Sequence, residues 1–77
     1  MLHVLSADYK GAYRIHLRFS DGREGTIDLQ SRLHGEVFEP LRDPKFFAAF
    51  KLNSDFGVIE WDNGADLAPE ALATYLQ

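Results

Sequence analysis

The fold is decided by residues 13–29, YRIHLRFSDGREGTIDL. Apolar and polar side chains alternate strictly over 13–19, which is the period of a strand with one buried face. The next three residues, Ser20-Asp21-Gly22, are typical of a tight turn in which Gly22 adopts the positive φ that other residues resist. Alternation resumes over 24–29. The stretch therefore predicts an antiparallel β-hairpin.

Both faces of this hairpin favour the same register. If Gly22 closes a three-residue loop, Phe19 lies opposite Arg23. Counting back from that pair gives apolar pairs on the inner face and opposite-charge pairs on the outer face. These pairs are Ile15 with Ile27, Tyr13 with Leu29, Arg18 with Glu24 and Arg14 with Asp28. A shift by one residue would destroy both sets. We interpret the charged pairs as a solvated ion-pair lattice, because general acids and bases need a cleft.

The segments around the hairpin predict further strands. Leu2–Ala7 predicts a first strand, joined to the hairpin through residues 8–11, and its apolar pattern leaves the inward face open. Residues 30–41 predict mostly loop. Short strands are expected at Leu52 and over 58–61, around an Asn53-Ser54-Asp55 turn.

Two helices are expected from their first residues. Asp43-Pro44 is typical of an N-cap followed by proline in the first turn, so a helix is predicted near Pro44–Ala49. Pro69 begins a last helix that must dock on the sheet, because a helix this short is unstable alone. Its docking face is expected to contain Ala68, Leu72, Tyr75 and Leu76.

These elements predict one domain over residues 1–77. The expected class is α+β: a small antiparallel β-sheet built from hairpins, with a short Phe-rich helix and a C-terminal helix packed on one face. The absence of cysteine excludes thiol catalysis, zinc–thiolate sites and iron–sulfur sites. A net charge of −4 with scattered Lys and Arg argues against direct nucleic-acid binding. With no signal peptide recognised and no apolar run near the roughly 20 residues of a membrane span, we expect a cytoplasmic protein and no membrane contact.

Several segments resemble one known family. They are residues 19–22 (FSDG), 27–29 (IDL), 37–43 (VFEPLRD) and above all 61–70 (WDNGADLAPE). Together they are similar to the bacterial "domain of unknown function 2442" family over nearly the whole chain, with Asp62 where the usual family form has proline. The resemblance implies a small α+β fold without established catalytic residues. It also implies a partner, because the genes of such proteins often neighbour that of another small uncharacterised protein, in a toxin–antitoxin-like arrangement. Some longer relatives continue into a helix-turn-helix domain, which we do not expect here.

The polar candidates for a site each have a structural interpretation. The acidic loop 62–66 lacks the glycine and the glutamate that an EF-hand requires. We interpret Asn63-Gly64 as its turn and the Asp66 side chain as an acceptor for the first amides of the last helix. The histidines are interpreted as partly exposed polar residues, although two of them lie on strands that we expect to pair; they are His3, His16 and His34. We therefore expect no metal site, no cofactor and no catalytic residue.

The Phe-rich segment is the strongest candidate for a contact surface. Phe46 and Phe47 point about 100° apart on a helix, so one face of a short helix does not bury both together with Phe50. Either all three rings reach the core, or one belongs to a patch that contacts a partner or a second copy. The candidate interaction or signature positions are Phe46, Phe47, Trp61, Asn63, Gly64 and Asp66.

The functional hypothesis is a protein-interaction or regulatory module and not an enzyme. Its expected partner is the small protein of the neighbouring gene, or a second copy in a homodimer. The alternative is a small-molecule-binding domain or a minor enzyme, which would need a concave pocket; a deep pocket lined by His16 or Trp61 would favour it.

Overall fold

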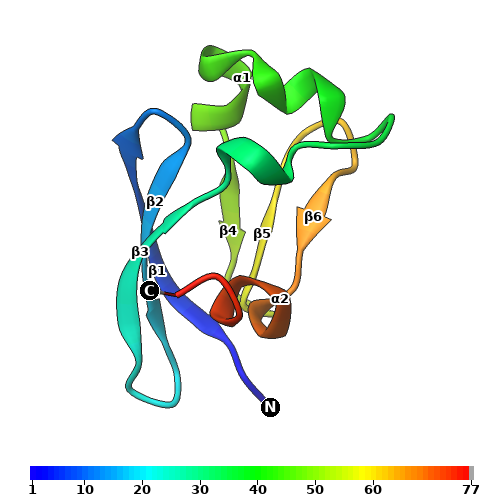
Figure 1. Cartoon of the computed structure of the whole chain (residues 1–77). Helices are drawn as coiled ribbons and strands as arrows, with labels where there is room; N and C mark the ends of the chain where they lie inside the picture. The colour runs from blue at the N-terminus through cyan, green and yellow to red at the C-terminus, as the bar shows by residue number, and fades with distance from the viewer. Residues whose placement is uncertain (77) are drawn as a thin grey trace.

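The computed structural model describes residues 1–76 and divides their strands between two three-stranded antiparallel sheets (Figure 1). The strand orders are β1-β2-β3 and β4-β5-β6. The elements in chain order are β1 (Val4–Gly11), β2 (Arg14–Phe19), β3 (Glu24–Asp28), the 3₁₀ helices η1 (Gln30–Arg32) and η2 (Glu39–Arg42), α1 (Pro44–Ala48), β4 (Lys51–Asn53), β5 (Val58–Glu60), β6 (Asp66–Leu67) and α2 (Pro69–Ala73). The predicted α+β class is confirmed, with the strands divided between two sheets where a single one was expected.

The β2–β3 hairpin has the predicted register. Arg14 pairs with Asp28, and Arg18 pairs with Glu24. The loop closes through the Phe19 N–H, which donates to the Arg23 carbonyl oxygen at 2.8 Å. The inward side chains of both strands are buried, as the alternation requires.

A bulge in β1 explains why the sequence left its inward face open. The pairing of β1 with β2 shifts register between Val4 and Ser6. Such a bulge changes which face the following side chains occupy. Val4 is accordingly buried, Leu5 is 55% exposed, and Ala7 and Tyr9 pack against the core.

The connection from β1 to β2 differs from the prediction. Residues 8–11 belong to the strand, and the turn is formed by Ala12 and Tyr13, whose φ angles are 53° and 64°. Tyr13 therefore precedes β2 instead of beginning it. Its hydroxyl donates to the Arg42 carbonyl oxygen, which ties this turn to the end of η2.

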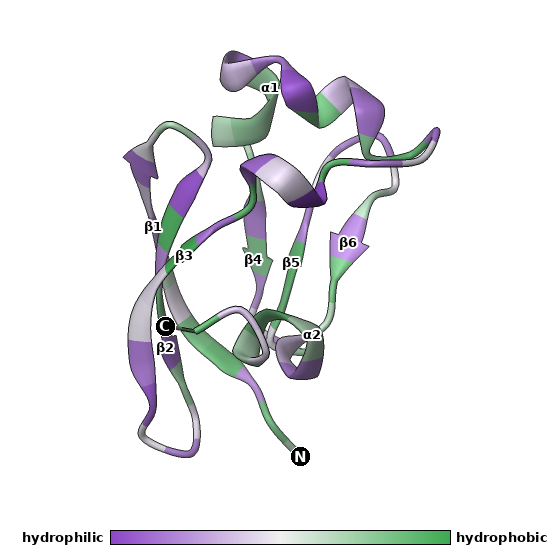
Figure 2. Cartoon of the chain, in the orientation of Figure 1, coloured by the Kyte–Doolittle hydropathy of each residue, from purple (hydrophilic) through white to green (hydrophobic). Residues whose placement is uncertain are grey.

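One aromatic cluster holds the two sheets and α1 together. Phe47 of α1 is fully buried, and its ring centroid lies 5.8 Å from that of Tyr9, 5.2 Å from that of Tyr13 and 5.7 Å from that of Trp61. These separations are typical of tilted and edge-to-face aromatic pairs. Figure 2 shows hydrophobic bands on β4 and β5 in the middle of the molecule, between the first sheet and β6.

The helix ends agree with the sequence at α1 and only in part at α2. The Asp43 carboxylate accepts the Lys45 N–H at 3.0 Å, so the predicted N-cap of α1 is confirmed. Leu72 of α2 is fully buried, as docking requires. Ala68, however, is the exposed N-cap of α2 and not part of its docking face, where Pro69 is buried instead.

The two sheets meet closely where β1 begins. The Val4 N–H donates to the Gly57 carbonyl oxygen at 2.9 Å. A Cβ atom placed on Gly57 would lie 2.5 Å from the Cβ of His3, so only glycine fits this contact unchanged. None of the helices within residues 1–76 is long and apolar enough to cross a membrane.

Candidate functional site

The most specific segment of the sequence, residues 61–66, serves the fold. The buried Trp61 donates its indole N–H to the Phe47 carbonyl oxygen at 2.9 Å. The Asn63 side chain accepts the Ala65 N–H at 3.1 Å and donates to the Val37 carbonyl oxygen at 2.8 Å. With Gly64 at a φ of 92°, this turn anchors the loop before η2. Trp61, Asn63 and Gly64 are therefore accounted for by structure.

Asp66 does not have the predicted capping role. It lies in β6, where it pairs with Glu60, and α2 has no side-chain hydrogen bond at its N-cap, Ala68. The backbone of Asp66 belongs to the β5–β6 ladder, three residues before the helix begins at Pro69. The acidic loop does form an ion pair, but through Asp62, whose carboxylate lies 3.1 Å from the Lys51 ammonium.

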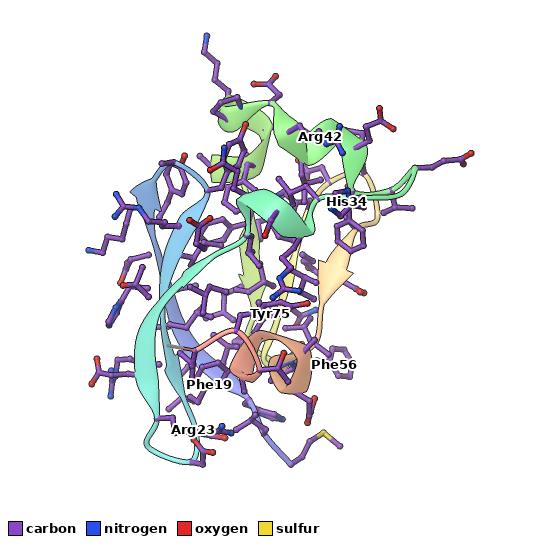
Figure 3. All side chains as sticks on the ribbon, viewed as in Figure 1. Phe19, Arg23, His34, Arg42, Phe56 and Tyr75 are labelled. Carbon is purple, nitrogen blue, oxygen red and sulfur yellow. The ribbon has the colours of Figure 1, made fainter. Side chains whose placement is uncertain are left out.

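Of the two alternatives for the Phe-rich segment, the structure shows the one in which all three rings reach the core. Phe47 is fully buried, and Phe46 and Phe50 are partly buried against the core. Phe56, in the β4–β5 turn, is 67% exposed, and Figure 3 shows it at the margin of the molecule near α2. Only its place after the Asn53-Ser54-Asp55 turn, outside the strand pattern, distinguishes Phe56 from the core rings in the sequence.

The three histidines are not brought together. His16 of β2 lies opposite Asp8 of β1 and not opposite His3. His3 instead packs against Gly57. His34 lies beside η2, its Nδ1 3.4 Å from the Arg42 guanidinium (Figure 3). Across residues 1–76 no three His, Asp or Glu side chains are grouped to hold a metal ion.

The outer face of the first sheet carries a hydrogen-bonded row of polar side chains. His16 Nδ1 lies 3.0 Å from the Thr26 hydroxyl, and His16 Nε2 lies 3.1 Å from a Glu24 carboxylate oxygen. Hydroxyl, imidazole and carboxylate follow one another as in a hydrolase triad. The His16 and Glu24 side chains are 31% and 57% exposed, on an open face, whereas nucleophilic catalysis uses preorganised donors in a site that excludes water. The row is better explained as cross-strand stabilisation.

The predicted ion-pair lattice on this face does not form, although its register is correct. The Arg14 guanidinium turns to the carbonyl oxygens of Gly11 and Lys10, at 3.2 and 3.3 Å. The Asp28 carboxylate accepts the Gln30 N–H at 2.9 Å. An ion pair with an exposed carboxylate on the neighbouring strand adds little stability, so the arginine side chain can bond to backbone carbonyl oxygens instead. The acidic side chains of β3 are therefore not neutralised by the arginines that face them.

The turn of the same hairpin has its own ion pair. The Asp21 carboxylate accepts the Arg23 N–H at 3.1 Å and the Arg23 Nε–H at 2.8 Å. The backbone hydrogen bond, followed by the guanidinium, lowers the pKa of the Asp21 carboxyl below its ordinary value.

β3 forms one open edge of the first sheet. The Phe19 N–H donates to the Arg23 carbonyl oxygen, and the Leu29 N–H donates to the Tyr13 carbonyl oxygen. The backbone N–H and C=O groups of the odd-numbered residues of β3 therefore point toward β2. Because backbone groups alternate in direction along an antiparallel strand, those of Glu24, Thr26 and Asp28 face away from β2. Within the described part of the chain β3 pairs with β2 alone. Along its five residues the strand thus offers the backbone groups of these three for further pairing.

A groove of about 420 Å³ continues from the Asp28 end of this edge. The Arg32 guanidinium lies over the Tyr75 ring within it, 4.5 Å from the ring centroid. The complete lining is Asp28, Gln30, Ser31, Arg32, Thr74, Tyr75 and Leu76. Polar groups and one aromatic face therefore border the position where a strand added to β3 would leave the sheet.

The sequence prediction identified residues 24–29 as a strand without recognising it as an edge. Two features pointed to one. Gly25 is unfavourable in a central strand, and charged Glu24 and Asp28 at both ends are typical of edge strands. In the structure Leu76 occupies the space that a side chain at Gly25 would fill, 3.1 Å from its Cβ position.

Comparison with known proteins identifies a family. No curated protein and no solved structure matches the chain. The model of one family, described as "Protein of unknown function (DUF2442)", matches residues 4–76. That range begins with β1 and extends past α2, so it includes both sheets and both α-helices. The chain therefore belongs to the DUF2442 family.

Proposed function

We propose that this protein is an interaction module that takes up an extended segment of a partner protein as an additional strand beside β3. The observation that supports this proposal is the open edge, where Glu24, Thr26 and Asp28 direct their backbone N–H and C=O groups away from β2. An extended segment laid along β3 would pair with these groups, as in other complexes formed by strand addition. Neither sheet has to rearrange for it to bind.

The other strand edges are less suited to this role. β1 donates its Val4 N–H to Gly57 and contains two register shifts, which twist an edge away from a straight partner. β4 has three residues and β6 has two, and very short edge strands resist pairing. With five residues and a regular ladder, β3 has the best geometry for an additional strand.

For the partner, we propose the small protein encoded by the neighbouring gene, as the family resemblance implies. In that case the module would have a regulatory role within a toxin–antitoxin-like pair. We propose the cytoplasm as the compartment, and the absence of cysteine supports it, because small secreted domains usually depend on disulfides.

Small-molecule binding has less support. The groove beside β3, at about 420 Å³, exceeds the ~300 Å³ of small ligand sites. Its lining, however, includes neither His16 nor Trp61, either of which would have favoured that hypothesis. The groove also adjoins the strand edge, where it can accept the continuation of a bound segment.

The test is co-purification with the co-expressed neighbouring-gene protein, comparing Thr26→Pro with Thr26→Val. Proline removes the Thr26 N–H, which faces away from β2, and leaves the β2–β3 ladder intact. Valine keeps the N–H and favours a strand, and both variants lose the contact with His16. One lost hydrogen bond, about 1 kcal/mol, together with the bulk of the ring predicts at least a roughly tenfold weaker complex for Thr26→Pro alone.

Circular dichroism of both variants establishes that the sheet is retained. Equal binding by the proline and valine variants would mean that the β3 edge is not the site. If the co-expressed protein fails to co-purify with the wild-type chain, the proposed partner is wrong.

A further inference from the structure

We infer that the segment taken up by β3 carries basic side chains opposite Glu24 and Asp28, four residues apart. This inference rests on the proposed function and concerns the chemistry of the partner. Glu24 and Asp28 are exposed on the outer face at the two ends of the edge strand, with Thr26 midway between them. An additional strand places one of its side chains directly opposite each of these three, on the same face.

Among the described residues each carboxylate on β3 has one oxygen in a hydrogen bond, and neither is paired with the arginine that lies opposite it. Arg14, opposite Asp28, bonds to the carbonyl oxygens of Gly11 and Lys10 and not to the carboxylate. Across residues 1–76 a Glu24 carboxylate oxygen lies 3.1 Å from His16 Nε2, and Glu24 forms no salt bridge with Arg18, which lies opposite it. The outer face of the edge is therefore acidic at both ends.

The same charges disfavour a second copy as the occupant. Two β3 strands paired antiparallel over their full length would be centred on Thr26. That register places Glu24 of each copy directly opposite Asp28 of the other. Like charges in directly opposed positions destabilise a pair of strands. The edge is thus suited to a segment of opposite charge and unsuited to its own copy.

The inward side of the added strand meets an apolar surface. Gly25 has no side chain, and Leu76 lies beneath it, 3.1 Å from the position of a Cβ atom. Leu76 is partly exposed and also lines the groove beyond Asp28. Apolar side chains at the inward positions of the segment would cover it. The preferred segment therefore alternates basic and apolar residues, with a β-branched polar residue opposite Thr26.

The test measures binding of two peptides by NMR titration of the backbone amides of β3. One peptide contains KVTVK between glycine–serine flanks, and the other contains EVTVE in the same flanks. At low ionic strength the wild-type chain should bind the basic peptide about tenfold more tightly, with the largest shifts at Glu24, Thr26 and Asp28. Added salt should reduce the preference, because the pairs are exposed to solvent.

The double variant Glu24→Gln, Asp28→Asn should lose this preference while keeping its side-chain hydrogen bonds and its fold. The matched control is Asp8→Asn, which removes an exposed carboxylate from β1 of the same sheet and should leave the preference unchanged. Binding of both peptides to β3 with equal affinity would overturn the charge inference and leave strand addition intact. Failure of the basic peptide to shift the β3 amides at millimolar concentration would also overturn it, and the Thr26 comparison would still decide the proposed function separately.

Discussion

Replacing Gly57 with alanine should destabilise this protein more than the same change at any open turn. Gly57 has a φ of 67° and accepts the Val4 N–H at the contact between the two sheets. Its added Cβ would lie 2.5 Å from the Cβ and 2.7 Å from the Cα of His3. Because a backbone atom is among these neighbours, a rotamer change alone does not relieve the overlap, and the chain must move apart at this point.

The magnitude follows from a comparison with Gly64→Ala. Gly64 also has a positive φ, 92°, but nothing lies within 4 Å of its Cβ position. Both variants incur the left-handed strain of alanine, about 1–2 kcal/mol, and both stiffen the unfolded chain by a similar amount. Only Gly57→Ala adds overpacking, which costs about 1–3 kcal/mol. The difference between the two variants therefore isolates the contact with His3.

Urea unfolding followed by the fluorescence of the buried Trp61 measures that difference. With a slope near 1 kcal/mol/M for a domain of this size, the Gly57→Ala midpoint should lie about 1–3 M below that of Gly64→Ala. The total stability of such a domain is roughly 4–12 kcal/mol, so the effect is large enough to resolve. Equal midpoints would refute the reasoning, because they would show that the sheets separate at Gly57 without cost.

Two further changes test the core and the hairpin turn. Trp61→Phe removes the donor to the buried Phe47 carbonyl oxygen and should lower the free energy of unfolding by about 1–3 kcal/mol, measured by circular dichroism in urea. The Asp21 carboxyl has its pKa lowered in the folded state, so its contribution to stability is present above the unfolded pKa and is lost as the pH falls through the folded value. Asp21→Asn should therefore reduce the loss of stability below about pH 4, in urea unfolding repeated across acidic pH, and an unchanged pH profile would contradict this assignment.

The central hairpin could be predicted because its local signals agree with one another. Apolar pairs such as Ile15 with Ile27 and charged pairs such as Arg18 with Glu24 require the same register, and Gly22 closes it. Helix α1 was predictable for the same reason, since Asp43 as N-cap and proline in the first turn are local features. Each of these depends on residues close together in the sequence.

The features that sequence reasoning missed depend on distant contacts. The bulge in β1 follows Val4, which pairs with Phe19 of β2 and also donates its N–H to Gly57, and no local pattern reveals these two contacts. The sequence predicts Asp66 as a helix cap, but in the structure it pairs with Glu60 and belongs to β6. The exposure of Phe56 and the open edge at β3 depend on which elements pack beside them in the folded chain.

Two sheets of three strands have four outer edges, and within residues 1–76 these edges differ in how well they could accept another strand. The edge of β1 is bulged and bonded to Gly57, while β4 and β6 are too short to accept a strand of useful length. β3 has a regular ladder with β2 and is acidic at both ends, which hinders pairing with its own copy without blocking a basic strand. An edge that needed only protection would be served as well by proline or an inward-pointing charge, which would exclude every partner alike. Selective protection of this kind is what a strand-accepting module requires.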